Sequence, residues 1–154
     1  LLSQALEISK QRGLARYETI QNEFNLYTRD SFEGPVQDLC VREGISGLAY
    51  YGLASGFLTG KYRSEADFSK SPRGARMANY LDQKGRRILA ALDAVSARTG
   101  ATLAEISIAW IIAQPGIGAP IASATSVEQL QSLMRGARLQ LSAEDLRELT
   151  EAGR

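Results

Sequence analysis

The segment over residues 48–61, LAYYGLASGFLTGK, combines residue types that suit a phosphorylated ligand. It begins as a short apolar run with aromatic residues, which is typical of a buried strand, and continues into a loop interrupted by Gly52, Gly56 and Gly60. Glycines let a ligand approach the backbone, where amide N–H groups can bind phosphate oxygens. The pattern predicts a strand that ends at a ligand site, although a plain glycine-rich turn fits the same spacing.

The side chains of this segment add to that interpretation. The hydroxyls of Ser55 and Thr59 suit phosphate oxygens, and Lys61 adds a positive charge. An aromatic ring, Tyr50 or Tyr51, is placed at the strand end, where it could stack on a flat group. We therefore expect a ligand with both a phosphate and a flat ring.

Length, composition and charge limit the classes of protein to consider. The 154 residues are 44% hydrophobic and 23% charged, as expected for one soluble globular domain over residues 1–154. The formal net charge of +1 gives no electrostatic reason to expect a nucleic acid or a membrane as partner. No segment approaches the length of a membrane span, and the first residues lack the pattern of a signal peptide, so the expected location is cytoplasmic.

The rare residue types restrict the chemistry. There is no histidine, so a Ser/His/Asp or Cys/His nucleophile cannot be built, and a Cys/His metal site is not expected. The single Cys40 excludes an internal disulfide and is interpreted as an apolar filler in a helix. Any catalysis by this chain alone would have to use carboxylates, lysine or tyrosine.

Helices and strands alternate along the chain. The expected order is helix 1–12, strand 16–22, helix 35–43, strand 45–50, a polar loop over 63–82, helix 84–99, helix 102–114, strand 119–122, a helix capped at 126 and a last helix from 142. No capping residue precedes Leu1, which suggests a chain cut within a larger fold. The long loop is expected to be a lid or a mobile insertion, whose Lys70, Arg73 and Arg76 either cover an anion or are simply solvated.

Capping residues predict the starts of three later helices. Thr102 and Glu105 form a predicted capping box, and Ser126 is a predicted N-cap. Ser142 is a third N-cap, which we expect to pair only imperfectly with Asp145.

Strands that alternate with helices imply parallel strands joined by right-handed crossovers, in a sheet covered on both faces. An open doubly wound sheet and a closed (β/α)8 barrel both meet this requirement. The first strand lacks a glycine fingerprint, which argues against the open dinucleotide-binding sheet. In a barrel, the strand ends at 21–22, 50–51 and 123–126 would all lie on the catalytic face.

Three motifs in order resemble the second half of the aldo-keto reductase family. They are IQNEFN at a strand end, AYYGLASGFLTGKY where the family has an AYSPL-type turn, and PIASATSVEQL where it has a PIPGATSVEQL-type strand and helix. The resemblance extends over nearly the whole chain. It implies an α/β fold, namely the C-terminal portion of a (β/α)8 TIM barrel with three parallel strands and flanking helices.

The resemblance also implies cofactor-binding roles. Gln21 falls where the family has a glutamine that hydrogen-bonds the nicotinamide carboxamide, and Tyr50 falls where an aromatic ring stacks on the nicotinamide. The residues that match positions around the pyrophosphate are Tyr51, Leu53, Ser55 and Gly56, with Lys61 as an added charge. Those that match the segment at the adenosine end and its 2′-phosphate are Ser123, Ala124, Thr125 and Gln129. A helix that begins at Ser126 would favour an anion there.

Four departures from the family pattern bear on the cofactor. Gly52 replaces the usual proline, and Tyr51 replaces the usual serine, which would loosen the pyrophosphate turn. Leu133 stands where many members have an asparagine for the adenine, and no arginine occupies the position of Gln129. The implied cofactor is NADP (NADPH), with NAD as the alternative.

The family's catalytic aspartate, tyrosine, lysine and histidine come from the first half of the barrel, so no residue of this chain is expected to be catalytic. Tyr50 and Lys61 both match cofactor positions instead. The implied protein is a fragment of an NADP-dependent aldo-keto reductase of the bacterial-type oxidoreductase branch. Its chemistry is hydride transfer between nicotinamide and a small-molecule aldehyde or ketone, and the chain alone is expected to be inactive.

Two alternatives stay open. Barrels of this kind also serve as nucleotide-sensing regulatory subunits of the ion-channel β type. A half-barrel without activity could instead pair with the missing N-terminal half or with another copy, because exposed strand edges bind partners.

Overall fold

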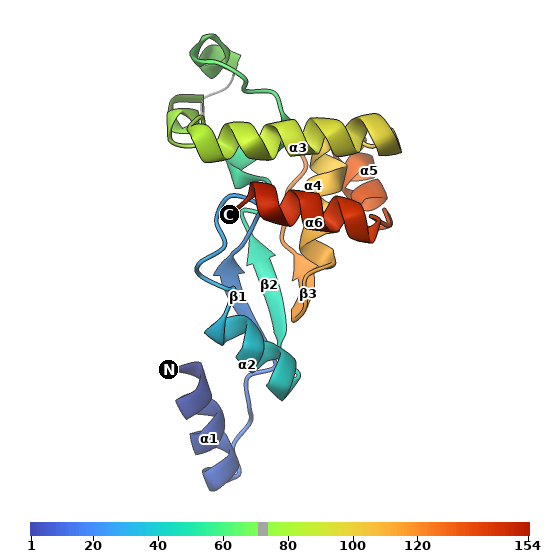
Figure 1. The fold of residues 1–154 in the computed structure, drawn as a ribbon. Helices are drawn as coiled ribbons and strands as arrows, with labels where there is room; N and C mark the ends of the chain where they lie inside the picture. Colours follow the sequence, from blue (N-terminus) through green and yellow to red (C-terminus); the bar gives the residue numbers. More distant parts are fainter. Residues whose placement is uncertain (71–73) are drawn as a thin grey trace.

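A parallel sheet of three strands forms the centre of the fold (Figure 1). The structure, a computed structural model, describes residues 1–70 and 74–154, with only the backbone described for residues 70 and 74–76. The strands are β1 (Thr19–Glu23), β2 (Ser46–Tyr50) and β3 (Ile117–Pro120), in the order β1-β2-β3. Both neighbouring pairs are parallel. The predicted α/β architecture, part of a (β/α)8 barrel, is therefore confirmed.

Six α-helices and three short 3₁₀ helices are described around the sheet. The α-helices are α1 (Leu2–Arg12), α2 (Pro35–Glu43), α3 (Gln83–Thr99), α4 (Leu103–Ile112), α5 (Val127–Gly136) and α6 (Ala143–Ala152). The 3₁₀ helices are η1 (Ala54–Thr59), η2 (Glu65–Lys70) and η3 (Gly74–Asn79), so the long loop contains local structure. The side chains of Lys70, Arg73 and Arg76 lie outside the described residues, so their expected contact with an anion stays a prediction.

The third strand lies earlier in the chain than predicted. Gly116 has a φ of 80°, which lets the chain turn sharply after α4. Its carbonyl then accepts a hydrogen bond from the Gly47 amide at 2.7 Å, and pairing with β2 begins at Ile117. Residues 121–126 follow as an irregular segment and not as the strand end that we expected.

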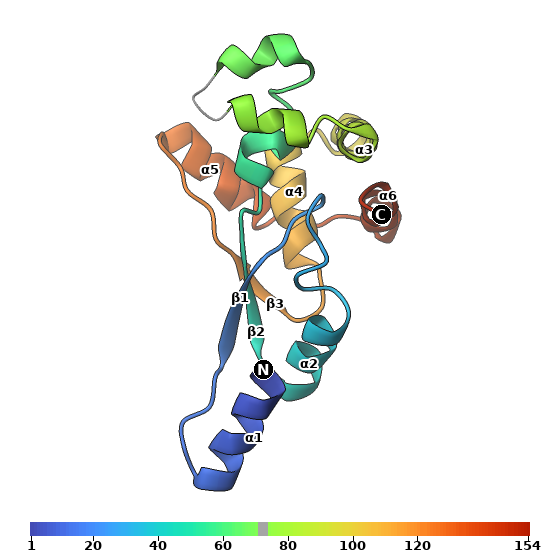
Figure 2. The same cartoon turned by 90° about the vertical axis from the view of Figure 1, so that its left-hand side faces the viewer.

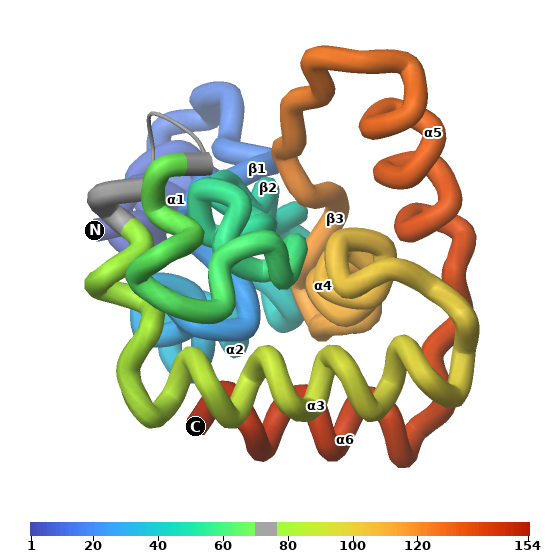
Figure 3. Tube along the Cα trace, turned by 90° about the horizontal axis from the view of Figure 1, so that it is seen from above, coloured from blue at the N-terminus to red at the C-terminus, as the bar shows by residue number. Residues whose placement is uncertain are grey.

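Helices cover one face of the sheet, and α3 and α6 lie side by side in an outer layer (Figures 2 and 3). On β2, Gly47 and Ala49 are buried, whereas the alternate residues Ser46 and Leu48 are half-exposed. A side chain at Gly47 would contact the Phe32 ring at 2.8 Å, which shows how closely the loop before α2 packs on this face. The other face of β2 points away from the described helices.

The core is centred on aromatic side chains between the sheet and α4. The Phe24 ring lies 5.2 Å from the Phe32 ring and 5.4 Å from the Trp110 ring, measured between centroids. All three side chains are fully buried. Cys40 is buried as well, and burial raises the pKa of its thiol, which confirms that it is an apolar filler.

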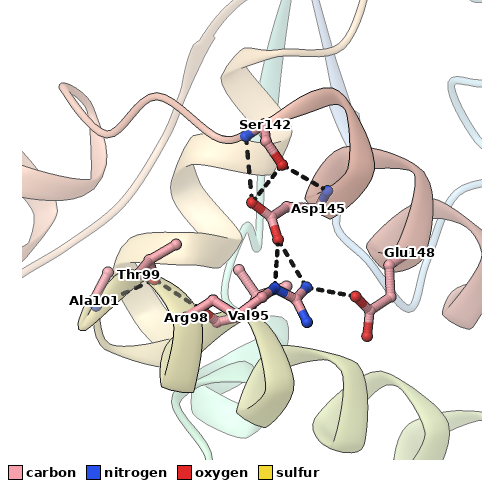
Figure 4. Close-up of polar contacts among 7 residues, drawn as sticks. All are labelled: Val95, Arg98, Thr99, Ala101, Ser142, Asp145 and Glu148. Carbon is pink, nitrogen blue, oxygen red and sulfur yellow. Dashed lines mark hydrogen bonds and ion pairs between the residues drawn. The ribbon is translucent and has the colours of Figure 1, made fainter.

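The cap of α6 is bonded to α3, its neighbour in the outer layer (Figure 4). The capping box of Thr102 and Glu105 is present, as predicted. The box at Ser142 is also complete, so the expected imperfect pairing was wrong. One Asp145 oxygen accepts hydrogen bonds from the Ser142 amide and hydroxyl, while the other accepts from Arg98 at 2.7 Å. The same carboxylate therefore completes the cap of α6 and binds Arg98 of α3.

Candidate functional site

The carboxyl ends of β1 and β2 place two predicted site residues on the same sheet face. In a parallel pair, residues in register point to the same side, and so do residues two positions apart. Gln21 is in register with Leu48, and Glu23 is in register with Tyr50. Gln21 and Tyr50 therefore share the face that the described helices leave open, and both are exposed. A flat group above this face could contact both side chains.

The turn after β2 contains an unusual run of left-handed backbone. Tyr51, Ala54 and Ser55 have φ values of 54°, 47° and 57°, and Gly56 follows at 98°. Residues other than glycine rarely adopt this region, and such strain is concentrated at functional sites. Gly52 has no positive φ; it is buried, and a side chain there would contact Ile111 at 3.0 Å. The glycine at position 52 is explained by packing against α4.

The side chains of this turn lie close to one another. The rings of Tyr50 and Tyr51 are 5.4 Å apart and cross at 66°, with exposed fractions of 37% and 54%. The Lys61 ammonium lies close to the turn, since its Nζ atom is 3.5 Å from the position that a Cβ atom would take at Gly56. The Thr59 hydroxyl donates to the Gly56 carbonyl at 2.7 Å, so this group, which we expected to suit phosphate, already has a partner.

The third predicted segment lies at the same end of the sheet. The Ile121 amide donates to the Ala49 carbonyl at 2.7 Å, which holds the start of this segment beside the end of β2. The remaining predicted residues, Ser123, Ala124, Thr125 and Gln129, are all exposed. The structure thus brings the three predicted segments to one edge.

The N-terminus of α5 favours negative charge. Ser126 caps the helix by accepting from the Gln129 amide at 3.3 Å, as predicted. The amide of Glu128 itself, and then the Ser126 hydroxyl, hold the pKa of the Glu128 carboxyl below its usual value. The helix dipole would also favour a phosphate at this end, where it would replace the Glu128 carboxylate at these donors.

An aromatic cluster beside the strand ends is not predictable from local sequence. The Tyr80 ring stacks on Phe57 at 5.3 Å and meets Tyr27 edge-on at 4.9 Å. Burial raises the pKa of Tyr80, and nearby Glu23 and Tyr51 raise it further, which places Tyr80 close to the site. The only signal in the sequence was the length of the loop over residues 63–82, which we expected to be a lid or a mobile insertion.

One combination in this cluster has the residue types of a proton-transfer site. The Tyr27 hydroxyl donates to Asp82 at 2.9 Å, and the Lys84 ammonium lies 5.2 Å from the Tyr27 ring centroid. Burial first, and then the hydrogen bond to Asp82, raise the pKa of Tyr27 to about 12. A proton donor of this kind needs a lowered pKa, so Tyr27 is suited to a structural role.

The strand ends form an open surface. Two described hollows lie elsewhere: one of about 370 Å³ where α3, α4 and α5 meet, and one of about 530 Å³ beside α1. Among residues 1–70 and 74–154, no group of His, Cys, Asp and Glu side chains could hold a metal ion. Within the same described part, every helix is too short or too polar to cross a membrane.

Comparison with known proteins gives a consistent result. The model of the Aldo/keto reductase family matches residues 2–154. Protein tas of Escherichia coli is 31% identical over 150 residues, which is 94% of this chain and 42% of that protein. An uncharacterized oxidoreductase of Mycobacterium bovis is 40% identical over 112 residues, 70% of this chain and 33% of the relative. A probable voltage-gated potassium channel subunit beta of Arabidopsis thaliana is 32% identical over 124 residues, 75% of this chain and 37% of the relative.

These relatives are much longer than the chain, which spans about two fifths of the length of protein tas. The similarity therefore covers only part of each relative.

Proposed function

We propose, from the premise that this chain belongs to the aldo/keto reductase family, that it carries the cofactor-binding part of an NADP-dependent oxidoreductase. The observation that supports this most strongly is the position of Gln21, Tyr50 and the 121–126 segment at one edge of a parallel sheet. The cofactor supplies hydride chemistry with an aldehyde or ketone as the second substrate. The chain itself supplies binding and orientation.

Each segment has a proposed part in binding. The Gln21 carboxamide pairs with the nicotinamide carboxamide, and the Tyr50 ring stacks on the nicotinamide. Left-handed backbone around Ser55, with Lys61 above it, receives the pyrophosphate. The segment from Ser123 to Gln129 receives the adenosine end, with NADP favoured by the helix terminus and NAD as the alternative. We assign no catalytic residue here, so the isolated chain is proposed to bind the cofactor without turnover.

Titration with NADPH tests the proposal. We expect NADPH fluorescence to change saturably with this chain, and Tyr50→Ala to weaken binding about three- to tenfold, the value of one aromatic stacking contact. Tyr17→Ala is the matched control, because Tyr17 is 59% exposed and lies before β1. Equal loss in both variants, or none in either, would contradict the assignment of Tyr50.

A nucleotide-sensing role is the second proposal. It is supported by the relative named as a potassium channel beta subunit and by the lack of an assigned catalytic residue. In that role, the bound nucleotide would regulate a protein partner. Co-purification from the source cells without any bound protein would contradict it.

Pairing of half-barrels is a third proposal, supported by the sheet face that carries Leu48 and Tyr50 in the open. The partner would be a complementary half or another copy. Elution as a monomer with one cooperative unfolding transition would contradict pairing with another copy.

A further inference from the structure

The loop after β1 is attached directly to the strained turn after β2. The Phe24 amide donates to the Tyr50 carbonyl at 3.3 Å, and the Asn25 side chain donates from Nδ2 to the Tyr51 carbonyl at 3.0 Å. Two consecutive residues of one segment thus bind two consecutive carbonyls of the other. These bonds span the point at which the strand becomes the left-handed turn.

Asn25 is fully buried, and both polar atoms of its side chain make hydrogen bonds. Its Oδ1 atom accepts hydrogen bonds from the amides of Tyr27 and Thr28, both at 2.8 Å, while Nδ2 faces the Tyr51 carbonyl. The opposite amide orientation would set N–H groups against N–H groups and one oxygen against another. The position therefore requires a donor on one side and an acceptor on the other, which a buried asparagine supplies.

The Tyr51 carbonyl is the point at which this contact acts on the turn. It also accepts from the Ala54 amide at 2.7 Å, the bond that closes the turn. Tyr51 itself has a φ of 54°, an unfavourable conformation for a tyrosine that persists only when its surroundings hold it. The bond from Asn25 is the described side-chain contact that holds this carbonyl.

We propose that Asn25 is a positioning residue for the cofactor turn: through the Tyr51 carbonyl it holds the left-handed backbone that receives the pyrophosphate. This inference rests on the proposed function for its consequence, which is tighter binding of the dinucleotide. The contact by which Asn25 holds the turn does not depend on the proposed function. Asn25 touches neither the adenosine segment nor, in this proposal, the cofactor.

The test is the single substitution Asn25→Asp. Aspartate keeps the acceptor for the Tyr27 and Thr28 amides but removes the donor and places an oxygen against the Tyr51 carbonyl. The matched control is Asn22→Asp, because Asn22 also donates from Nδ2 to a backbone carbonyl, that of Ser31 at 2.7 Å, but not to the turn. Both variants add the same charge at the same end of β1.

Two ligands separate positioning from general damage. NADPH reaches the turn, whereas 2′,5′-ADP contains only the adenosine end. We expect Asn25→Asp to weaken NADPH binding about tenfold, the effect of one lost hydrogen bond, and to leave 2′,5′-ADP binding unchanged. Asn22→Asp should leave both unchanged. Equal weakening of both ligands by Asn25→Asp would overturn the proposal.

Amide hydrogen exchange tests the link without any ligand. Asn25→Asp should speed exchange at the Ala54, Gly56 and Leu58 amides, whose bonds close the turn, and Asn22→Asp should not. If the unmodified chain binds neither ligand, the proposed function fails, and this exchange result alone decides on Asn25. Unchanged exchange in Asn25→Asp would overturn the positioning role.

A double variant keeps the test decisive if Asn25→Asp folds poorly. Tyr51→Gly removes the cost of left-handed backbone at that position. In the pair Asn25→Ala with Tyr51→Gly, which lacks the opposed oxygens of Asn25→Asp, we expect slow exchange or cooperative folding to return. Failure of this rescue would show that Asn25 acts other than through the Tyr51 conformation.

Discussion

In the proposed cofactor site, Gln129 determines what the adenosine end offers to a phosphate. Its Oε1 atom accepts from the Thr125 amide at 2.9 Å and from the Thr125 hydroxyl at 3.1 Å, so the side chain organises the segment that precedes α5. It carries no charge. A 2′-phosphate at this position would depend on the Ser126 hydroxyl and the helix N-terminus, which favour an anion but provide no full positive charge.

A charged residue at this position should increase discrimination between the two nicotinamide dinucleotides. We expect Gln129→Arg to raise the ratio of the NADH to the NADPH dissociation constant about two- to fivefold, the worth of an exposed ion pair. Parallel fluorescence titrations measure this ratio, and it should fall again at high salt. Gln131→Arg is the control, since this exposed residue lies two positions further along the helix. The same shift with Gln131→Arg would mean that overall charge is responsible.

At the scale of elements, α6 is held to the fold by a cap and an ion pair that share one carboxylate (Figure 4). The Ser142 hydroxyl, and then the Arg98 guanidinium, hold the pKa of Asp145 below its usual value. Arg98 also reaches Glu148 at 2.5 Å. The Asp145 side chain is only 9% exposed, so its charge is well placed to stabilise the contact between α3 and α6.

This arrangement predicts a pH-dependent stability. Because the folded pKa of Asp145 is lowered, its contribution is complete above the unfolded pKa and is lost as the pH falls through the folded value. Asp145→Asn should therefore cost about 1 kcal/mol at pH 7 and much less at pH 3, as measured by urea unfolding. The neighbouring exposed Glu144→Gln should cost little at either pH. A difference that stays constant between the two pH values would exclude the carboxylate as its cause.

Local patterns were sufficient for much of the fold. Proline at the start and glycine after the end predict α2 with its observed bounds, Pro35–Glu43. The predicted start of β3 was wrong by two residues. The prediction followed the apolar residues that continue past Pro120, whereas the turn at Gly116 decides where pairing with β2 begins. Hydrogen bonds between distant segments set these limits, and they leave little trace in a local pattern.

In the candidate site, too, local patterns predict some features and distant contacts decide others. Residue types at the strand ends were enough to place Tyr50 and the glycine loop at the end of β2, and their cofactor roles stay predictions. The strain at Tyr51 was not predictable, because a left-handed tyrosine depends on Asn25, 26 residues earlier in the chain. The contact of Tyr27 with Asp82 likewise joins residues 55 positions apart. Contacts of this kind form only in the assembled fold, so the neighbouring residues in the sequence do not predict them.

On the scale of the whole molecule, the three candidate site segments are far apart in sequence, and the sheet brings them to one end (Figure 2). Parallel sheets are normally covered on both faces, yet the face with Gln21, Leu48 and Tyr50 is left open by the described helices. A dinucleotide there would join the ends of β1 and β2 to the start of α5. Its binding should therefore be linked to the stability of the fold as a unit.

This link between binding and stability gives a prediction for the 154-residue chain. NADPH at about 100 times its dissociation constant should add about 2.7 kcal/mol to the free energy of unfolding, provided that the unfolded chain does not bind it. For a chain of this length, thermal unfolding should then move up by about 5–10 °C, and the shift should keep growing with the logarithm of ligand concentration. Tyr50→Ala should need proportionally more NADPH for the same shift, whereas Tyr17→Ala should not. A saturated binding signal without any thermal shift would mean that NADPH also binds the unfolded chain, and would contradict a site that exists only where the three strand ends are assembled.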